Sequence, residues 1–389
     1  MSFEIRPLTD DDREQAWSLG RLAFGGDPAA LPPADFRADD GLALVDAAGR
    51  LLGKCRLRSY EQWWGGRRVP MGGVAGVAVH QDARGTGAAS RLVRAMLPMM
   101  QERGHAVSVL YPTAVGLYRP LGWEIVGSLD ETTLATADLR AAGDPVGVRV
   151  RTAGPADAAA VHELYSWYGE TCGGLLTRTG PEFPAGPSGL LGHDVVALAE
   201  AEDGALLGYA SYDRGRGYGP QARLRVWELV TRSGEAGSAL VRSLGSWDSV
   251  APTVEWRGPT DELSLLLSRP VPGSHAVQPW MLRIVDAAAA IAQRGFAPAA
   301  SVDASFALVD PDLVGHDGAW RLVVRDGVGT LERDTRAGDL PLLHVRGLAL
   351  LYAGAADTGL LLRAGLLDRP MPTLDAAFAG PRPRLLDYF

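Results

Sequence analysis

Arg84-Gly85-Thr86-Gly87 has the composition of a turn that can hold a phosphate group. An apolar stretch ending in Val77-Ala78-Val79 precedes it, and Ala88-Ala89 opens a segment with helical periodicity after it. Small residues let backbone N–H groups approach a diphosphate at a helix N-terminus, where the helix dipole also favours an anion. The strand end before the turn can pair with an extended ligand. We therefore predict that residues 77–79 and 84–89 bind one phosphate-bearing ligand, although a plain helix start would use the same residues.

Other sites for phosphates or metals fit this sequence less well. The dinucleotide fingerprint G-x-G-x-x-G is not met, because Ser90 stands where its last glycine would be, and the Gly-Lys-Ser/Thr of a P-loop is lacking. Cys55 and Cys172 are far apart, and the histidines show no spacing typical of metal ligands. We predict no metal site and assign both cysteines to packing.

The elements that must position the turn have the order of an α/β domain. A turn is predicted at 65–70, helices over 10–25 and from residue 88, and strands over 3–9, 41–46, 51–64, 71–80, 105–113 and the end of 116–127. Proline lacks the N–H that an interior helical position needs, so Pro98 is expected to kink or end the second helix.

Two further sets of elements follow. The second contains a strand and helix within 147–170, a Gly- and Pro-rich surface connection over 173–194, and more strands. The third begins near residue 285 with a helix and continues with strands, among them 341–354, and short helices. We predict domains of residues 1–140, 141–284 and 285–389, the last of α+β class.

The first two domains share an internal repeat. "SRLVR" (90–94) and "SALVR" (238–242) each follow an apolar strand and a glycine-containing turn, which indicates a duplicated unit. In the second copy Glu235 stands where an anion would bind, and its charge would repel a phosphate. We predict that the second domain is a degenerate copy.

The run from Val77 to Ala89, followed by "LYRPLGW", resembles the GNAT acetyltransferases, whose phosphate turn reads Gln/Arg-x-x-Gly-x-Gly/Ala. Arg84 to Gly87 fits this pattern, as does Tyr118-x-x-x-Gly122-Trp123, whereas Asp82 replaces the usual Gln or Arg. The resemblance covers about 130 residues and implies acetyl-CoA as the ligand of residues 77–79 and 84–89. A mixed central sheet flanked by helices is the fold that it implies.

The whole chain resembles the Eis (enhanced intracellular survival) family, which has tandem GNAT domains and a third domain similar to sterol carrier proteins. The resemblance implies a hexamer that acetylates amines of aminoglycosides and lysines. It also implies Tyr118 as general acid and the α-carboxylate of Phe389 as base. The family's penultimate acidic residue is not matched, because Tyr388 stands there and Asp387 comes one place earlier.

The chemistry of amine acetylation agrees with these roles. An alkyl amine with a pKa near 10.4 must lose a proton before it attacks, and the departing thiolate needs one back. A tyrosine can supply that proton, and a strand amide of residues 77–79 can hold the oxyanion. No covalent intermediate is needed.

Bulk composition limits partners and location. With 46 acidic and 38 basic residues the chain has a formal net charge of −8, which disfavours nucleic acid and favours cationic amines. No apolar run reaches the roughly 20 residues of a membrane helix, and no secretory signal is evident, so we predict a cytoplasmic protein.

Two other functions are also compatible with the sequence. The chain could be a hydrophobic-ligand carrier that works through its third domain, or a scaffold that binds coenzyme A without catalysis. The intact turn at 84–87 and Tyr118 favour the enzyme over both.

Overall fold

The structure is a computed structural model that describes residues 3–27, 29–32, 40–268, 270, 273–313, 315–336 and 338–389. It forms two compact units, one of residues 1–126, 280–383 and 389, the other of residues 127–279 and 384–388. No helix in the described ranges is long and apolar enough to cross a membrane.

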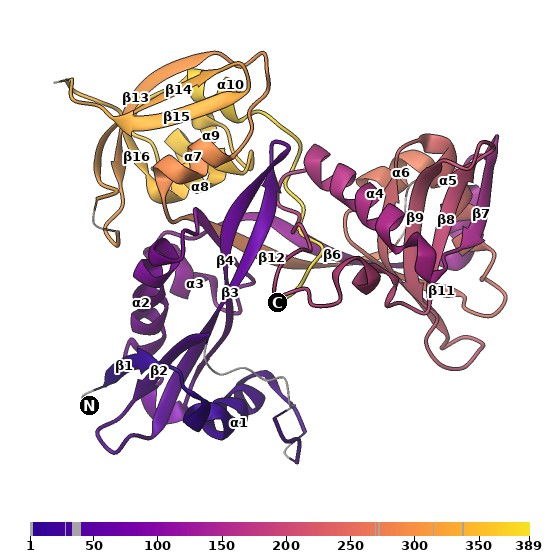
Figure 1. Ribbon diagram of the computed structural model, residues 1–389, viewed down its shortest axis with the longest axis horizontal. Coiled ribbons are helices and arrows are strands. Elements are labelled where there is room, and N and C mark those ends of the chain that lie inside the picture. Colours follow the sequence, from indigo (N-terminus) through magenta and orange to yellow (C-terminus); the bar gives the residue numbers. More distant parts are fainter. Residues whose placement is uncertain are drawn as a thin grey trace. The chain divides into compact units, whose positions relative to one another are not determined.

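The first unit opens with a sheet whose strands come from the first domain and from β12 (Figure 1). In spatial order these are β1 (Glu4–Pro7), β2 (Gly41–Val45), β3 (Leu51–Trp64), β4 (Arg67–Val79), β5 (Val107–Leu110) and the last part of β12 (Ser274–Ile284). Only the β4–β5 pair is parallel among them; the others are antiparallel. Side chains on a strand alternate between its two faces, so this sheet can bury apolar side chains on both.

Helices α1 (Arg13–Phe24) and α2 (Ala88–Glu102) pack on opposite faces of this sheet. Helix α1 buries Ala16 and Leu19 against a small cluster that contains Ala78. Helix α2 packs into a larger cluster on the other face, together with the short helix α3 (Val115–Tyr118) and the strand β6 (Glu124–Ala135) that follows it.

One local prediction for this domain is wrong, and of the two outcomes expected at Pro98 the structure excludes an end of the helix. The turn at 65–70 is confined to Gly65 and Gly66, since β4 already begins at Arg67. Helix α2 continues through Pro98 to Glu102. Proline has no N–H to bond the carbonyl one turn earlier, but Pro98 is exposed, so water can solvate that carbonyl. Buried Leu97 and Met100 hold the helix on the sheet.

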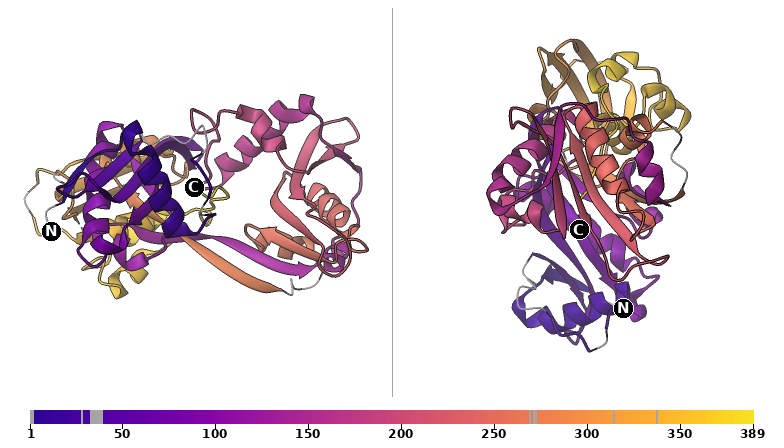
Figure 2. Two further views of the ribbon diagram at one scale, coloured as in Figure 1. Left: turned by 90° about the horizontal axis from the view of Figure 1, so that it is seen from below. Right: turned by 90° about the vertical axis from the view of Figure 1, so that its right-hand side faces the viewer.

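The second unit repeats the plan of the first domain. Its strands are, in spatial order, the later part of β6, β11 (Thr253–Arg257), β10 (Arg223–Thr231), β9 (Leu206–Asp213), β8 (Val195–Ala201) and β7 (Val148–Thr152). Helices α4 (Ala158–Thr171) and α5 (Gly234–Gly245) lie on opposite sides of these strands, as the right-hand view of Figure 2 shows. A short helix, α6 (Asp261–Leu266), packs near α5.

The connection at 173–194 is not a simple surface segment, contrary to the prediction. Leu175 and Leu176 are fully buried, and the Tyr165 hydroxyl donates a hydrogen bond to the Leu176 carbonyl at 2.8 Å. The glycines and prolines that suggested a surface loop lie mostly after residue 179, where exposure is higher.

The last domain belongs to the first unit and has one four-stranded sheet with helices beside it (Figure 1). Its strands are, in spatial order, β15 (Val328–Arg333), β14 (Gly318–Arg325), β13 (Val302–Val309) and β16 (Leu342–His344). Its helices are α7 (Ala287–Gln293), α8 (Val345–Tyr352), α9 (Thr358–Arg363) and α10 (Pro372–Phe378).

The predicted strand at 341–354 is wrong beyond its first residues. It ends at His344, whose ring Nδ1 accepts a hydrogen bond from the Arg346 N–H and so caps α8. Most of α8 is buried, and a short apolar run buried on all sides has no periodicity that separates helix from strand. β14 and β15 form a hairpin, with Asp326 and Gly327 of its turn at positive φ.

An arginine–aspartate pair recurs at the start of the first two domains. Arg6 donates two hydrogen bonds to Asp12 at 2.6 and 2.8 Å, and Arg151 donates two to Asp157 at 2.8 Å each. Each aspartate also accepts a backbone N–H three residues earlier, so it links the strand to the helix that follows. The same separation of six residues in both domains is a second indication of duplication.

We expect Asp12→Asn to destabilise the protein by about 2 kcal/mol, because the side chain is buried and binds a charged partner. The hydrogen bond from Arg6 lowers the pKa of Asp12 to about 2. A lowered pKa stabilises the fold above the unfolded value, near 4, and that contribution is lost as pH falls toward 2. Urea unfolding of both proteins from pH 7 to 2.5 measures this; an equal loss at pH 7 in a variant of exposed Asp11 would contradict it.

Candidate functional site

The site is built where two parallel strands separate. β4 and β5 pair over three residues and stop at Gly73 and Val109. Beyond that point β4 runs on to Val79, and its backbone on that side has no partner in β5. An extended ligand can therefore pair with β4 over 74–79 in place of a strand.

The turn predicted to bind phosphate follows β4 directly. Gly85 and Gly87 have φ of +75° and +78°, a left-handed conformation that favours glycine, and a Cβ on either would meet nothing within 4 Å. The Thr86 hydroxyl donates to the Ala83 carbonyl at 2.7 Å, which holds the turn. Its exposed glycines therefore leave open space before α2.

The first turn of α2 is free to meet an anion. Gly87 is its N-cap, no described side chain caps it, and Ala88 and Ala89 begin it without an acidic residue. The charge of Asp82, which departs from the GNAT pattern, is balanced by Arg50 at 3.0 Å. These residues fit the diphosphate of acetyl-CoA.

The equivalent helix of the second unit lacks this property. The side chain of Ser233 accepts the Ala236 N–H at 3.2 Å, and Glu235 adds a negative charge in the first turn of α5. The helix start is thus already capped and repels phosphate. The chain therefore contains the same strand-to-helix junction twice. The helix N-terminus is uncapped and open to an anion in the first unit, and it is capped in the second.

Tyr118 ends α3, on the same face of the sheet as α2. It is 4% exposed and lies in the cluster that also holds Ala88 and Cys55, with its ring centroid 6.4 Å from that of Trp123. Burial raises the pKa of Tyr118 to about 12, with a smaller contribution from Cys55. Its phenol is therefore protonated at neutral pH and can donate a proton.

Phe389 lies on the opposite face, against β3 and β4. Its ring centroid is 4.9 Å from that of Tyr60 and 6.0 Å from that of Tyr111, and a side chain on Gly73 would collide with it. With residues of α1 and β4, among them Gly76, it lines a cavity of about 370 Å³. The structure thus gathers residues 77–79, 84–89 and Tyr118 near the separated strands, and sets Phe389 in a cavity across the sheet.

The wall of this cavity contains a buried lysine that was not predicted. Lys54 of β3 lines it and is only 4% exposed. The other charged side chains among the described residues that line this cavity are Arg21, Asp27, Arg56 and Arg58.

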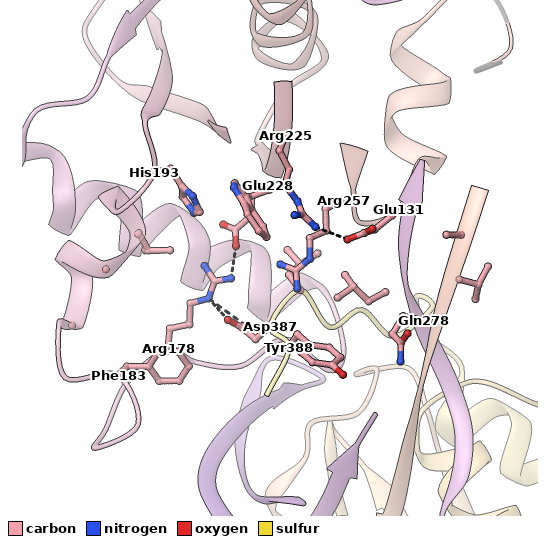
Figure 3. Close-up of a pocket in the computed structure, with 18 residues that line it drawn as sticks. Glu131, Arg178, Phe183, His193, Arg225, Glu228, Arg257, Gln278, Asp387 and Tyr388 are labelled. Carbon is pink, nitrogen blue, oxygen red and sulfur yellow. Dashed lines mark hydrogen bonds and ion pairs between the residues drawn. The ribbon is translucent and has the colours of Figure 1, made fainter. Parts of the chain in front are cut away.

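A second cavity, of about 730 Å³, lies in the second unit (Figure 3). Arg178 lies between Glu228 and Asp387, donating to both, at 3.0 Å in the case of Asp387. The Tyr209 hydroxyl donates to Glu228 at 2.6 Å. The acidic side chain nearest the chain end is therefore engaged in an ion pair.

This ion pair was not predicted, because Arg178 stands in the segment expected to be a surface connection. Burial alone would raise the pKa of both carboxyls, yet the charge of Arg178 lowers that of Glu228, while that of Asp387 stays raised. The lining of this cavity mixes charged and apolar side chains, and Arg225 stacks over Trp227 at 4.5 Å.

Comparison with known proteins now decides the family. Residues 4–126 and 177–284 each match an acetyltransferase (GNAT) domain, and residues 287–386 match a sterol carrier protein domain. A GCN5-related N-acetyltransferase from Kribbella flavida is 35% identical, with a TM-score of 0.85 over 100% of this chain and 98% of its own. The chain belongs to the GCN5-related N-acetyltransferase (GNAT) family. It is thus a GNAT-family N-acetyltransferase.

Two further relatives extend the comparison. An uncharacterised N-acetyltransferase of Streptomyces griseus is 27% identical over the whole of both chains. Eis1 of Mycobacterium abscessus shares the fold at 23% identity, with a TM-score of 0.75 and full coverage of both chains. The predicted fold class, tandem GNAT domains followed by a sterol-carrier-like domain, is confirmed, and its overall fold is Eis-like.

Proposed function

We propose that this GNAT protein transfers an acetyl group from acetyl-CoA directly to a primary amine. The observation that carries the proposal is the open junction of the first domain, where an unpaired stretch of β4 leads into an uncapped α2. Residues 77–79 would pair with the extended arm of acetyl-CoA, and residues 84–89 would bind its diphosphate. GNAT domains use this donor.

Tyr118 is the proposed general acid. Its buried phenol is protonated at neutral pH and lies in the cluster that contains the first residue of α2. A backbone amide of Val77–Val79 would hold the negative charge that develops on the acetyl oxygen. The proton of Tyr118 would go to the departing thiolate, so no enzyme-bound intermediate forms. Cys55 is fully buried, and burial raises its pKa to about 12, which makes it a poor nucleophile.

The α-carboxylate of Phe389 is the proposed base, which accepts the proton of the attacking amine. We expect that adding Gly-Ser after Phe389 lowers kcat about tenfold, because the ring keeps its place while the carboxylate moves. Phe389→Leu, which keeps the carboxylate but not the ring contacts with Tyr60, separates the two contributions. Equal turnover of extended and parent proteins, at equal thermal stability, would end the proposal for the base and leave the transferase in place.

The proposed acceptors are aminoglycosides, polyamines and lysine side chains. The predicted preference for polycations rests on the net charge of the whole chain. The described wall of the cavity beside Phe389 has more basic than acidic side chains, because it carries one lysine, three arginines and one aspartate. This local charge supports a singly charged acceptor, such as a peptide lysine, over a polyamine.

A thiol-release assay tests the function. The purified full-length protein is incubated with acetyl-CoA and a panel of an aminoglycoside, spermidine and a lysine peptide, and free thiol is followed over time. We expect acceptor-dependent release of thiol. No release with any amine would contradict the proposed activity.

The remaining features of the proposal concern assembly and location. We propose three domains of residues 1–140, 141–284 and 285–389, and a cytoplasmic location. We also propose a homo-oligomer, and light scattering tests whether it is a hexamer. The partner is a small-molecule or peptide amine, without nucleic acid or membrane. The negative net charge supports the exclusion of nucleic acid.

A further inference from the structure

Lys54 is the only lysine in the 389-residue chain, in which every other member of the 38 lysine and arginine residues is an arginine. An amine acetyltransferase of this composition offers almost no amine of its own to the donor. Its one side-chain amine, that of Lys54, is buried rather than on the surface. Whether Lys54 can react therefore depends on where it lies relative to the candidate site.

Lys54 lies at the candidate site. In the register of β3 and β4 it is paired with Ala78, one of the residues proposed to hold the acetyl carbonyl. Its side chain points to the α1 face, where Nζ is 2.9 Å from the position that a Cβ on Gly20 would take. The same atom is 4.0 Å from the corresponding position on Gly76, in the irregular stretch of β4.

The surroundings of Lys54 favour the neutral amine. Burial is the larger cause and the charge of Arg56 the second, and together they lower the pKa of Lys54 to about 8. At pH 7.5 roughly a quarter of such side chains are unprotonated, about two orders of magnitude more than for a lysine of ordinary pKa. The other charged groups that line the cavity are Arg21, Arg58, Asp27 and the terminus at Phe389.

We propose that Lys54 is itself an acetyl acceptor, a self-acetylation site in the acceptor cavity of the enzyme. The inference rests on the proposed function, because it uses the same donor and the same general acid. Neutral Nζ attacks the thioester carbonyl carbon, a C–N bond forms and the C–S bond breaks. The thiolate leaves and takes its proton from Tyr118, and the proton lost by Nζ passes to the Phe389 carboxylate. Lys54 ends as a neutral amide.

The single lysine makes the test simple. The full-length protein is incubated with acetyl-CoA and no acceptor, and its intact mass is followed before peptide mapping. We expect a mass increase of one acetyl group, located on the peptide that contains Lys54. The initial rate should rise with pH to a midpoint near 8, in line with the lowered pKa of Lys54.

Matched variants complete the experiment. Lys54→Arg keeps a cation in the cavity but removes the nucleophilic amine, so no acetyl group should be added. Tyr118→Phe should slow the modification at least tenfold. Modification at the same rate in Tyr118→Phe or in urea-unfolded protein would mean uncatalysed chemistry, and modification of the N-terminal amine alone would place it elsewhere; either result overturns the inference.

The assay with external amines separates this inference from the proposed function. Thiol release with an external amine while Lys54 stays unmodified overturns self-acetylation and leaves the transferase intact. Absence of both reactions overturns both. Modification of Lys54 without turnover of any amine in the panel supports self-acetylation and contradicts the proposed transfer to these external amines.

Discussion

Tyr118→Phe is expected to lower kcat by about 10²- to 10³-fold while the Kd for acetyl-CoA changes less than threefold. The substitution removes only the phenolic hydroxyl, and the ring keeps its place in the cluster with Ala88 and its edge contact with Trp123. Steady-state kinetics with saturating amine, together with calorimetric titration of acetyl-CoA, measure the two effects. A loss of acetyl-CoA binding as large as the loss of kcat would instead mean that Tyr118 holds the donor in place.

The pH dependence gives a second readout of the same role. Because burial raises the pKa of Tyr118 to about 12, the acid remains protonated where an ordinary tyrosine would ionise near 10. The rate of the parent enzyme should therefore not fall between about pH 9 and 10.5 through loss of this proton. A decline with a midpoint near 10 that vanishes in Tyr118→Phe would contradict the buried environment.

Tyr352→Phe is a matched control for this variant. Tyr352 is fully buried in the last domain, and its hydroxyl has no hydrogen-bond partner among the described residues. Removing that hydroxyl leaves the ring contact with Trp64 intact and should leave kcat unchanged. Equal losses in the two variants would point to a general effect of removing a buried hydroxyl.

The turn at residues 84–87 could be predicted from the sequence because its conformational requirements are local. A turn with two left-handed positions selects glycine, and Gly85 and Gly87 take those positions. The recurrence of "SRLVR" as "SALVR" likewise pointed to the duplicated domain that the fold contains. The spacing of Arg6 and Asp12, repeated by Arg151 and Asp157, was an additional signal of duplication that the sequence held.

Long-range contacts could not be predicted in this way. Arg178 binds side chains 50 and 209 positions further along the chain, and no local pattern encodes such partners. The depth of Lys54 depends on space left by Gly20 on α1, which strand alternation does not reveal. The sequence shows that Lys54 is the single lysine, but its place in the wall of a cavity could be found only in the structure.

Ala89→Glu should raise the KM for acetyl-CoA by about 100-fold without loss of stability. The variant puts a carboxylate at the second position of α2, where Glu235 stands in α5 of the second unit. A negative charge there suits the positive end of the helix and is expected to stabilise it by about 0.3–1 kcal/mol. The same charge would lie within a few ångströms of a bound diphosphate, and repulsion of about 1–4 kcal/mol weakens binding by roughly 10- to 1000-fold.

Ala89→Gln separates charge from size, because it has the same length without the carboxylate. It should raise KM far less than Ala89→Glu. Since Ala89 is partly exposed, salt should screen the added charge, so the difference between the two variants narrows at high ionic strength.

Glu235→Ala provides the reverse case in the second unit. It should not create a site for acetyl-CoA, because Ser233 still caps the first turn of α5. Binding of acetyl-CoA by Ala89→Glu with the affinity of the parent would place the diphosphate away from α2. Weaker binding, together with unchanged or higher thermal stability, would tie the donor to the one helix start in this pair that is left open.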